Sequence, residues 1–456
     1  MIVSKFGGTS VGSAENIKKV IHIVQQKDQQ ATIVVSALGG VTNLLIKASE
    51  LALKNETGYE QIVDQIEQRH FETIEGLLNH DNQTVSKAEV AKKLNKLKEI
   101  LHGVALLNDL SDKTSARIVG LGEMLSSFII HQAMLQGKIK AQRIDSRELI
   151  KTNDNFLNAQ VNFIVTTSNI QEQLSNPDVH VFILPGFIAS NDKGETTTLG
   201  RGGSDYTAAI VANALSASFL EIWTDVSGMY TANPKLVRQA YPIEEISYQE
   251  AMELSHFGAK VLYPPTIQPA LDRKIPILIK NTLSADDKGT LITEKSLVSG
   301  SIVKGISHIE DIALLTLEGN GMVGVPGISK RLFGALAENN INVKFITQAS
   351  SEHSICIAIN TDESALAKEA IDAEFEFEIL QHKVNPLIIE ANLAIIALVG
   401  DNMKSHQGIS GRMFSELGTN NVNIRAIAQG STEKNISAVI SEKDVKKALN
   451  TLHAVF

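Results

Sequence analysis

The feature that most constrains the fold is an internal repeat in the last third of the chain. The segment GISKRLFGALAENNINVKFITQASSEHSI begins at Gly327, and GISGRMFSELGTNNVNIRAIAQGSTEKNI begins at Gly408. The two segments align without a gap at an offset of 81 residues, with 14 identities in 29 positions, which chance does not produce. Each copy has the pattern of a helix, an asparagine-rich turn and a strand, and each follows another apolar strand (IALLTLEG or LAIIALVG). The repeat therefore predicts a βαβ unit that is used twice.

The first part of the chain alternates strands with helices. Between residues 59 and 137 the apolar side chains recur three and four positions apart, which predicts helices. Continuous apolar, β-branched runs occur at residues 31–36, 179–185, 218–224 and 275–279. Such runs suit strands of a parallel sheet that is covered on both faces. We expect an α/β sandwich of about 290 residues with a helical excursion in its middle.

Composition argues against several classes of protein. The formal net charge is -9 and no run of Lys or Arg exceeds two, which argues against binding to nucleic acid or to an anionic membrane. Cys356 is the only cysteine, so a disulfide and a cysteine metal cluster are excluded. No apolar run approaches the roughly 18 residues of a membrane span, and the N-terminus has the pattern of a strand and not of a signal peptide. We therefore expect a cytoplasmic protein.

Four segments rich in glycine or hydroxyl residues each follow an apolar run. They are KFGGTSVG, SALGGVTN, LGRGGSDYTAA and TDVSGMYTANP. In an open parallel sheet, ligands bind beyond the carboxyl ends of the strands, so the four segments are predicted to converge on one crevice. Taken singly each is weak, because a glycine pair in a turn usually only makes the turn.

The first of these segments has the pattern of a phosphate loop. Its glycines would let the backbone come close to phosphate oxygens. The lysine precedes the glycines and no GK[ST] follows, so it is not a Walker loop. A GxGxxG fingerprint is also absent from it, which excludes a Rossmann loop. The segment therefore predicts a phosphate loop of another kind.

The segments KFGGTSV, GRGGSD and TDVSGMYTANP, together with FGAKVLYP further on, resemble the signature set of the aspartate kinases. That family has the amino-acid kinase fold, an open and mainly parallel sheet sandwiched by helices, followed by two ACT-type α+β regulatory domains (βαββαβ). The ACT pair would account for the repeat. Segments such as EIWTDVSGMYT and SYQEAMELSHFGAKVL are most similar to the aspartokinase half of bifunctional aspartokinase–homoserine dehydrogenases. This sequence contains no second nucleotide fingerprint, so we expect no dehydrogenase within it.

The resemblance implies transfer of the ATP γ-phosphoryl group to the β-carboxylate of L-aspartate. The product is 4-phospho-L-aspartate, at the first step of lysine, threonine and methionine biosynthesis. An aspartate side chain has a pKa near 4, so the nucleophile is already ionised and needs no general base. The reaction needs charge neutralisation and alignment instead, because two anions must approach one another.

The resemblance also implies roles for individual residues. The expected catalytic residues are Lys5, Asp205 and Arg201, with Lys5 bridging phosphoryl oxygens and Arg201 clamping the aspartate α-carboxylate. Glu123, in GLGEMLSS, is expected to receive the α-ammonium group. The expected ATP-binding residues are Lys5, Gly7, Gly8, Thr224, Asp225, Tyr230, Lys235, Lys260 and Val261. The remaining expected substrate-binding residues are Thr9, Ser36, Thr42, Gly202, Gly203 and Ser204.

Two places depart from the family pattern. The family commonly has Asp and Arg where this chain has Asn233 and Lys235, so the lysine keeps the charge and loses the guanidinium fork. Tyr263 stands where a histidine is usual. A simpler interpretation also stays open for the GRGGSD segment, in which Ser204 or Asp205 merely caps a helix.

Histidine spacing predicts no protein-built metal site, since twelve histidines show no metal-ligand spacing and HExxH is absent. We therefore expect Mg2+ to arrive with ATP, held partly by its phosphates.

The repeats are expected to bind a regulatory amino acid. Gln348 and Gln429 fall at equivalent places in the two copies, after Ile346 and Ile427, and we expect these four residues at the effector sites. A glutamine at this point is typical of threonine-regulated members, and the shorter ITTSE-like segment of lysine-regulated members is absent. The sequence therefore favours threonine over lysine. Repeats that only dimerise are the simpler alternative, and we expect a homodimer or tetramer formed through the ACT domains.

The polar, turn-rich stretch 282–301 places a domain boundary. We expect the kinase domain at residues 1–290, one ACT domain at 301–390 that the C-terminal segment can complete, and another at 391–456. Two other functions stay open. One is another kinase of the same fold, acting on acetylglutamate, glutamate or a nucleoside monophosphate, and the other is an amino-acid sensor without catalytic activity.

Overall fold

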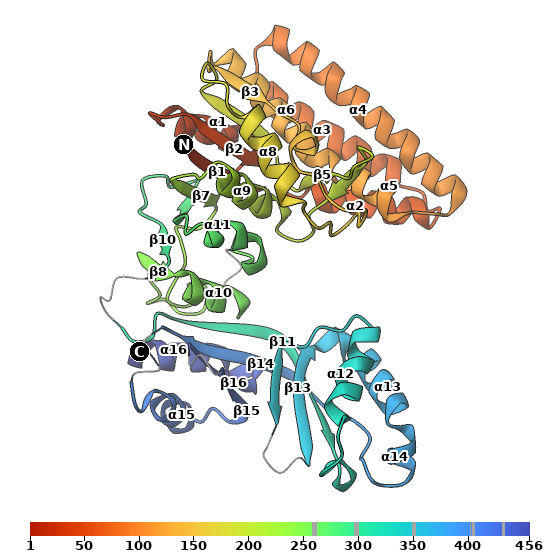
Figure 1. Ribbon diagram of the computed structural model, residues 1–456, viewed down its shortest axis with the longest axis vertical. Helices are drawn as coiled ribbons and strands as arrows, with labels where there is room; N and C mark the ends of the chain where they lie inside the picture. The colour runs from red at the N-terminus through yellow and green to blue at the C-terminus, as the bar shows by residue number, and fades with distance from the viewer. Residues whose placement is uncertain (258–261, 296–300, 349–352, 402, 404–405, 431–433) are drawn as a thin grey trace. The chain divides into compact units, whose positions relative to one another are not determined.

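The computed structural model of the chain describes residues 1–257, 262–295, 301–348, 353–401, 403, 406–430 and 434–456. These residues form two compact units (Figure 1). The first comprises Met1–Met229, Pro242–Tyr248 and Val261–Leu297, and the second comprises Tyr230–Tyr241, Gln249–Lys260 and Val298–Phe456. The chain therefore leaves the first unit and returns to it twice before the second unit is completed.

The first unit is built on an eight-stranded sheet in the order β3-β4-β2-β1-β7-β9-β10-β8. Its neighbouring strands are parallel except β9 and β10, which are antiparallel. A separate hairpin joins β5 (Ile188–Ser190) to β6 (Thr196–Thr198). The strands of the large sheet are β1 (Ile2–Phe6), β2 (Ala31–Val35), β3 (Ala141–Arg143), β4 (Val181–Pro185), β7 (Phe219–Thr224), β8 (Glu245–Ser247), β9 (Ile277–Asn281) and β10 (Thr290–Thr293). The four predicted apolar runs are confirmed as β2, β4, β7 and β9.

Helices surround this sheet, and the predicted helical excursion is confirmed as α3 to α6 (Figure 1). The helices of the first unit are α1 (Ala14–Gln25), α2 (Val41–Leu53), α3 (Tyr59–Leu77), α4 (His80–Leu107), α5 (Asp112–Val119), α6 (Leu121–Gln136), α7 (Ser146–Leu149), α8 (Phe163–Gln173), α9 (Gly203–Ala214), η1 (Pro264–Ile267) and α11 (Gln268–Asp272). Side-chain caps start several of them: Ser13, Asn79 and Ser111 accept hydrogen bonds from the first turns of α1, α4 and α5.

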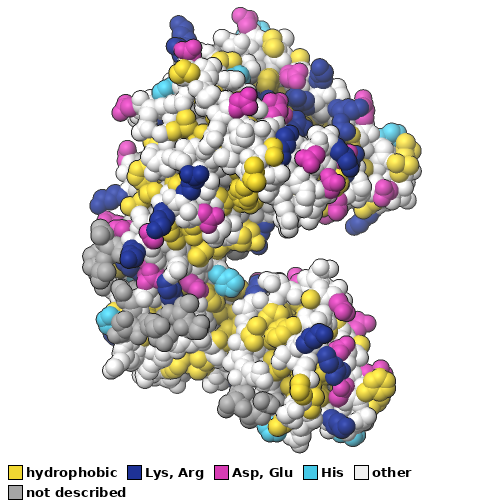
Figure 2. Space-filling view, in the orientation of Figure 1, with side chains coloured by type: hydrophobic (Ala, Val, Ile, Leu, Met, Phe, Trp, Pro, Cys, Tyr) yellow, Lys and Arg dark blue, Asp and Glu magenta, His cyan; other side chains and the backbone are white. Residues whose placement is uncertain are grey.

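The stretch 112–136, which covers α5 and α6, is long and apolar enough to span a membrane by length and composition alone. However, 67% of its apolar window is buried inside the protein, which is the property of a core helix. On the face that Figure 2 shows, Lys and Arg side chains are interspersed with Asp and Glu.

The second unit is built on a six-stranded sheet in the order β12-β13-β11-β14-β16-β15. Each of its neighbouring pairs is antiparallel. The strands are β11 (Gly305–Glu318), β12 (Phe345–Gln348), β13 (Ser354–Asn360), β14 (Ile388–Val399), β15 (Ile424–Gln429) and β16 (Asn435–Ser441). The long strands β11 and β14 pair with each other along most of their length, so the two repeats share one continuous sheet.

The helices of the second unit reflect the internal repeat. They are α10 (Tyr248–His256, whose first residue belongs to the first unit), η2 (Asn320–Met322), α12 (Ile328–Glu338), η3 (Thr361–Glu363), α13 (Ser364–Glu374), α14 (Glu376–Leu380), α15 (Ile409–Thr419), η5 (Glu442–Asp444) and α16 (Val445–Val455). Gly327 and Gly408 begin α12 and α15 with left-handed φ values of 97° and 87°. That conformation favours glycine, which explains why the sequence GIS opens both copies.

Candidate functional site

Lys5 lies in the centre of the first sheet and faces α9. Side chains alternate along a strand, and Phe6, Val35 and Trp223 are aligned on neighbouring strands and packed in one apolar core. Lys5 therefore points to the opposite face, where α9 packs on β1. Its Nζ lies 2.7 Å from Oδ1 of Asp205, and the two side chains are only 12% and 13% exposed. The structure thus brings together two of the three residues that are expected to be catalytic.

The first two glycine-rich loops contact each other through their backbones. The amide of Gly7 donates to the carbonyl of Trp223 at 3.0 Å, at the end of β7. A Cβ at Gly8 would lie 3.2 Å from the carbonyl oxygen of Ala37, and one at Gly39 would lie 3.0 Å from that of Gly8. Glycine therefore favours this close backbone approach, and the predicted convergence of KFGGTSVG with SALGGVTN is confirmed.

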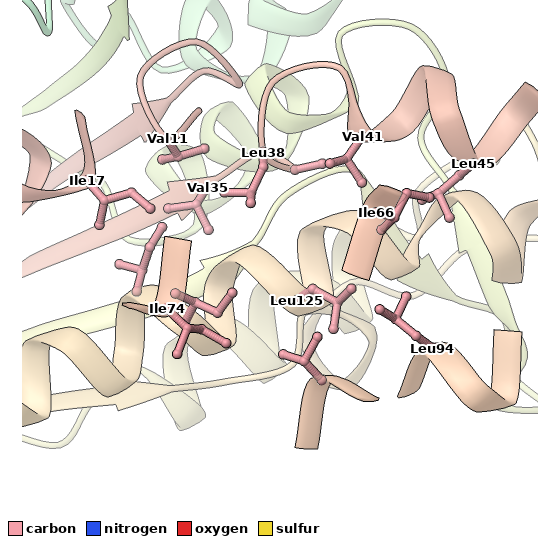
Figure 3. Packing of buried hydrophobic residues seen from close by; sticks show 14 of the residues in the cluster. Val11, Ile17, Val35, Leu38, Val41, Leu45, Ile66, Ile74, Leu94 and Leu125 are labelled. Carbon is pink, nitrogen blue, oxygen red and sulfur yellow. The ribbon is translucent and has the colours of Figure 1, made fainter. Parts of the chain in front are cut away.

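Apolar residues of both loops anchor them in the core. Figure 3 shows Val11 from the first loop, and Leu38 and Val41 from the second, packed among buried side chains of the first unit. The remaining predicted residues of these loops lie nearer the surface: Thr9 is exposed, and Ser36 and Thr42 are half-buried. The hydroxyls are thus accessible while the loops that carry them are fixed.

The third segment, GRGGSD, forms the N-terminus of α9. Gly202 is the N-cap residue, with a left-handed φ of 71° and no side-chain cap. Ser204 and Asp205 lie inside the helix, so neither caps it, and the simpler interpretation of this segment is wrong. The buried Gly203 and Ser204 follow in the first turn of the helix, and the amide of Gly203 donates to the carbonyl of Gly200 at 3.0 Å. The amide of Ser204 has no partner within the helix, which makes this end suitable for an anion.

Arg201, just before this helix, is exposed and lies over an aromatic ring. Its guanidinium carbon is 5.3 Å from the centroid of the Tyr263 ring. A guanidinium stacks on such a ring and keeps its N–H groups free for a carboxylate. The departure from the family pattern at Tyr263 thus gives Arg201 a supporting surface.

Glu123, in the first turn of α6, is a buried carboxylate with 4% exposure. Burial raises its pKa to about 8, against the opposing effects of backbone hydrogen bonds from Ala37 and Glu123 itself and of the positive charge of Lys5. Its Oε2 has no hydrogen-bond partner among the described residues. The Ser126 hydroxyl, one turn later, donates to the carbonyl of Ser36 at 2.7 Å and ties this helix to the second glycine loop. A buried carboxylate with one unpaired oxygen suits an incoming ammonium group.

The predicted nucleotide residues divide between the two units. Thr224 and Asp225 lie at the end of β7 in the first unit, where the Thr224 hydroxyl donates to the Asp225 carboxylate at 3.2 Å. Tyr230 is half-buried and Lys235 is exposed, and both belong to the second unit.

The departure at Asn233 has a local role. Its Oδ1 accepts a hydrogen bond of 3.0 Å from the amide of Lys235 and shapes the turn that carries this lysine. The predicted residues Lys260 and Val261 lie outside the residues that the structure describes.

Sequence reasoning missed two groups that hold the phosphate loop. The Ser10 hydroxyl donates to the carbonyl of Trp223 at 3.2 Å and accepts from the Thr282 hydroxyl at 2.7 Å. Glu221, buried in β7, accepts from Ser4, Lys27 and Trp223. A single charge inside the apolar run FLEIWT is the signal that could have found Glu221.

In the second unit, a cavity of about 350 Å3 adjoins the start of α12. Its lining residues are Met322, Gly324, Val325, Pro326, Gly327, Ile328, Ser329, Gln348 and Ile355. The structure therefore places Gln348 against the glycine-rich turn that leads into this helix. Ile346 is 52% exposed on the same strand, and Ile427 and Gln429 are exposed on β15. Strands β12 and β15 meet where the Thr347 hydroxyl donates to the carbonyl of Ile427 at 3.0 Å.

Comparisons with known proteins agree with this architecture. The amino acid kinase family matches residues 1–281, and the ACT domain matches residues 315–375 and 396–456. The first unit thus has the amino-acid kinase fold, and the second carries two ACT domains.

Full-length relatives identify the class of enzyme more closely than the two domain families do. The chain is 37% identical to the bifunctional aspartokinase/homoserine dehydrogenase of Buchnera aphidicola over 99% of its own length and 56% of that protein. It is 32% identical to lysine-sensitive aspartokinase 3 of Escherichia coli, over 100% of this chain and 98% of that one. The crystal structure of Escherichia coli aspartokinase III in complex with aspartate and ADP superimposes with a TM-score of 0.83 at 32% identity, covering 100% and 99% of the two chains. The chain therefore belongs to the aspartate kinases. It spans about half the length of the bifunctional relatives that it matches.

Proposed function

We propose that this chain transfers the γ-phosphoryl group of ATP to the β-carboxylate of L-aspartate, giving 4-phospho-L-aspartate for lysine, threonine and methionine biosynthesis. The observation that carries the proposal is the buried, unpaired carboxylate oxygen of Glu123. An ammonium group pairs with it and relieves the cost of burying the charge. L-aspartate supplies this group, whereas N-acetylated substrates do not.

The other charges of the substrate have partners of matching geometry. Arg201, supported by Tyr263, receives the α-carboxylate through its planar fork. Gly202, Gly203 and Ser204 lie at the start of α9, where Ser204 offers an amide of the first turn, and Thr9, Ser36 and Thr42 offer hydroxyl groups. The β-carboxylate is then free to attack, and because it is already ionised, no residue has to remove a proton.

Lys5 neutralises charge on the transferring phosphoryl group. Asp205 acts through it, since an ion pair of 2.7 Å fixes where the ammonium group lies. The amide of Gly8 lies beside it on the same loop, where the amide of Gly7 already donates to the carbonyl of Trp223 at 3.0 Å. Positioned donors of this kind stabilise the charge that spreads over phosphoryl oxygens in the transition state.

The nucleotide is assigned to the segments that follow β7. We assign its binding to Thr224, Asp225, Tyr230 and Lys235, with Lys260 and Val261 as in the family. Mg2+ fits this arrangement as an ion carried by ATP. We propose that the phosphates of ATP hold it in part. Among the described residues no group of three His, Cys, Asp or Glu side chains could hold a metal.

A substrate panel tests the reaction. Hydroxylamine traps acyl phosphates as hydroxamates, so the assay is run with ATP and L-aspartate, N-acetyl-L-aspartate, L-glutamate or N-acetyl-L-glutamate. We expect hydroxamate with L-aspartate and little with the others. Equal activity on N-acetyl-L-aspartate would contradict the role assigned to Glu123. Activity on L-glutamate alone would favour another kinase of the same fold. An absence of product with every acid would favour the amino-acid sensor.

We further propose that threonine, and not lysine, is the amino acid that regulates the enzyme. The relevant cavity has no charged side chain among its lining residues in the described part of the chain, and its polar side chains are Ser329 and Gln348. An amide and a hydroxyl can pair with the threonine hydroxyl, whereas a lysine ammonium requires a carboxylate once it is buried. Gln429, with Ile346 and Ile427 nearby, is assigned to the equivalent place in the second repeat.

Assembly, domain limits and compartment complete the proposal. We propose a homodimer or tetramer formed through the ACT domains, and domain limits of 1–290, 301–390 and 391–456. We also propose that the protein works in the cytoplasm, although plant relatives such as that of Zea mays are named as chloroplastic.

A further inference from the structure

Three strands of the first sheet, β1, β7 and β9, are neighbours and run parallel, so the loops that follow them meet at one edge of the sheet. The loop after β1 is assigned to phosphate. Thr224 and Asp225, at the end of β7, are assigned to the nucleotide. The loop after β9 begins at Thr282 and has no assigned role. All three loops lie within the first unit.

The carbonyl of Trp223, near the end of β7, holds the phosphate loop at two points. It accepts from the amide of Gly7 at 3.0 Å and from the hydroxyl of Ser10 at 3.2 Å. In the sequence, these two bonds lie on either side of Gly8 and Thr9, which carry an amide and a hydroxyl that we assign to the reactants. Fixing the loop at both points therefore restricts where those two groups can point.

Thr282 connects all three loops. It is 2% exposed, and its position at the end of β9 brings it across β7 to the phosphate loop. Its amide donates to the carbonyl of Thr224 at 2.9 Å, and its hydroxyl donates to the hydroxyl of Ser10 at 2.7 Å. Ser10 then uses its own proton for the carbonyl of Trp223. A chain of hydrogen bonds thus runs from the loop after β9, through the phosphate loop, to the backbone of β7.

Burial makes this chain of hydrogen bonds difficult to replace. Ser10, like Thr282, is 2% exposed. Without the Thr282 hydroxyl, the Ser10 oxygen would lose a buried donor, which is costly because water does not reach it in the closed loop. The phosphate loop would have to move outwards to restore that hydrogen bond, and its two assigned donors would move with it.

We propose that Thr282 is a positioning residue for phosphoryl transfer that acts through Ser10. The inference rests on the proposed function, in which the Gly8 amide stabilises charge on the phosphoryl oxygens. A donor that is fixed beforehand needs no reorganisation when that charge develops. A loosened loop has to be ordered as the transition state forms, so kcat falls. The charged groups of aspartate are assigned to Glu123 and Arg201, on other elements, so its KM would change little.

Two substitutions separate the hydroxyl of Thr282 from its shape. Thr282→Val keeps the branched shape and loses the hydroxyl, whereas Thr282→Ser keeps the hydroxyl and loses a methyl group. Ser10→Ala removes the partner, and the variant with both Ser10→Ala and Thr282→Val completes a double-mutant cycle. The matched control is Thr32→Val, which changes a buried threonine near the start of β2, away from the loops.

Turnover and stability are measured for each variant in the whole chain. Formation of aspartyl hydroxamate gives kcat and the KM values for aspartate and ATP. Urea unfolding gives the free energy of unfolding, so that a loss of stability is detected separately from a loss of turnover.

We expect Thr282→Val to lower kcat by roughly three- to tenfold, the range for one lost hydrogen bond. The KM for aspartate should stay within about threefold of the wild-type value. Thr282→Ser should keep most of the turnover although it leaves a small cavity, whereas a role in packing alone would make it the weaker variant. In the Ser10→Ala background, Thr282→Val should change kcat by less than about twofold, because both changes remove the same hydrogen bond. Thr32→Val should match the wild type in kcat.

Several results would overturn the proposal: wild-type kcat in Thr282→Val, a lower kcat in Thr282→Ser than in Thr282→Val, additive effects of the Ser10 and Thr282 changes, or an equal loss in Thr32→Val. Lys5→Ala separates such a failure from a failure of the proposed function. If the wild type forms aspartyl hydroxamate, Lys5→Ala does not and Thr282→Val matches the wild type, only the positioning role is wrong. If the wild type forms no hydroxamate from L-aspartate, the proposed function is wrong, and the positioning role falls with it.

Discussion

The ammonium nitrogen of Lys5 lies 2.7 Å from a carboxylate oxygen of Asp205, and this pair joins the first strand of the sheet to the first turn of α9. The lysine comes from the phosphate loop and the aspartate from the helix whose N-terminus is assigned to the substrate. The ion pair therefore links the loop assigned to phosphate with the helix assigned to the substrate. Lys5 and Asp205 can be replaced separately from the residues assigned to aspartate.

Replacing Lys5 with alanine should lower kcat at least roughly a hundredfold, as expected when one positioned donor to the transition state is lost. The variant should stay folded, because β1 is held by β2 and β7 and by the core beneath it. Steady-state kinetics with far-UV circular dichroism as the control checks this. Near-normal turnover in a folded variant would overturn the assigned role.

Arg201→Lys should raise the KM for aspartate sharply and leave the KM for ATP almost unchanged. The substitution keeps the charge, but it removes both the bidentate fork and the stacking on Tyr263. The two KM values, measured with the other substrate saturating, provide the check. A larger effect on ATP would mean that Arg201 belongs to the nucleotide.

Glu123 predicts a pH dependence of stability in the absence of ligands. Its pKa is about 8 in the folded protein and near 4.5 when unfolded, so the folded state binds more protons between these values. Stability should therefore fall as pH rises towards and through 8, and Glu123→Gln should remove this part of the decline. Urea unfolding of both proteins between about pH 6 and pH 9 measures it. Parallel curves for the two proteins would show that the carboxyl does not carry the raised pKa.

Gln348→Ala and Gln429→Ala test the regulatory proposal. Each change leaves the threonine hydroxyl short of a partner, at a cost of roughly 1 to 3 kcal/mol. The inhibition midpoint should rise by about one order of magnitude, while activity without threonine stays nearly unchanged. We expect unequal effects, because Gln348 lines a cavity beside a glycine-rich turn that the second repeat lacks.

Titration of the wild type and both variants with threonine, lysine and methionine provides the measurement and its controls. Inhibition by lysine alone would contradict the proposal that threonine is the regulatory amino acid. No response to any of the three amino acids would leave the repeats as a dimerisation module.

Much of this architecture could be predicted because it depends on local patterns. The β-branched runs became strands, and the spacing of apolar residues between positions 59 and 137 became helices α3 to α6. The repeat was detectable because Gly327 and Gly408 must adopt the same left-handed conformation before the same type of helix. The segments that carry Lys5 and Asp205 were expected in one crevice because they follow strands that end at one edge of a parallel sheet.

Other features depend on tertiary packing and left no local signal. The segment Tyr230–Tyr241 reads as a continuation of the kinase domain, yet its apolar residues are buried with α15 and α16, and α16 lies more than 200 positions later in the chain. The sequence shows that Tyr263 stands where a histidine is usual, but it does not show that the tyrosine ring lies beneath Arg201. The raised pKa of Glu123 depends on burial beneath several elements, which no single motif encodes.

The most direct test of the central claim identifies the carboxylate that receives the phosphoryl group. Borohydride reduces an acyl phosphate to an alcohol, so the reaction with ATP and L-aspartate is quenched with borohydride and its amino acids are separated. The account predicts ATP-dependent formation of homoserine, the product of reduction at the β-carboxyl, and its loss in Lys5→Ala. Formation of 3-amino-4-hydroxybutanoic acid, the product of reduction at the α-carboxyl, or ATP consumption without either alcohol, would contradict it.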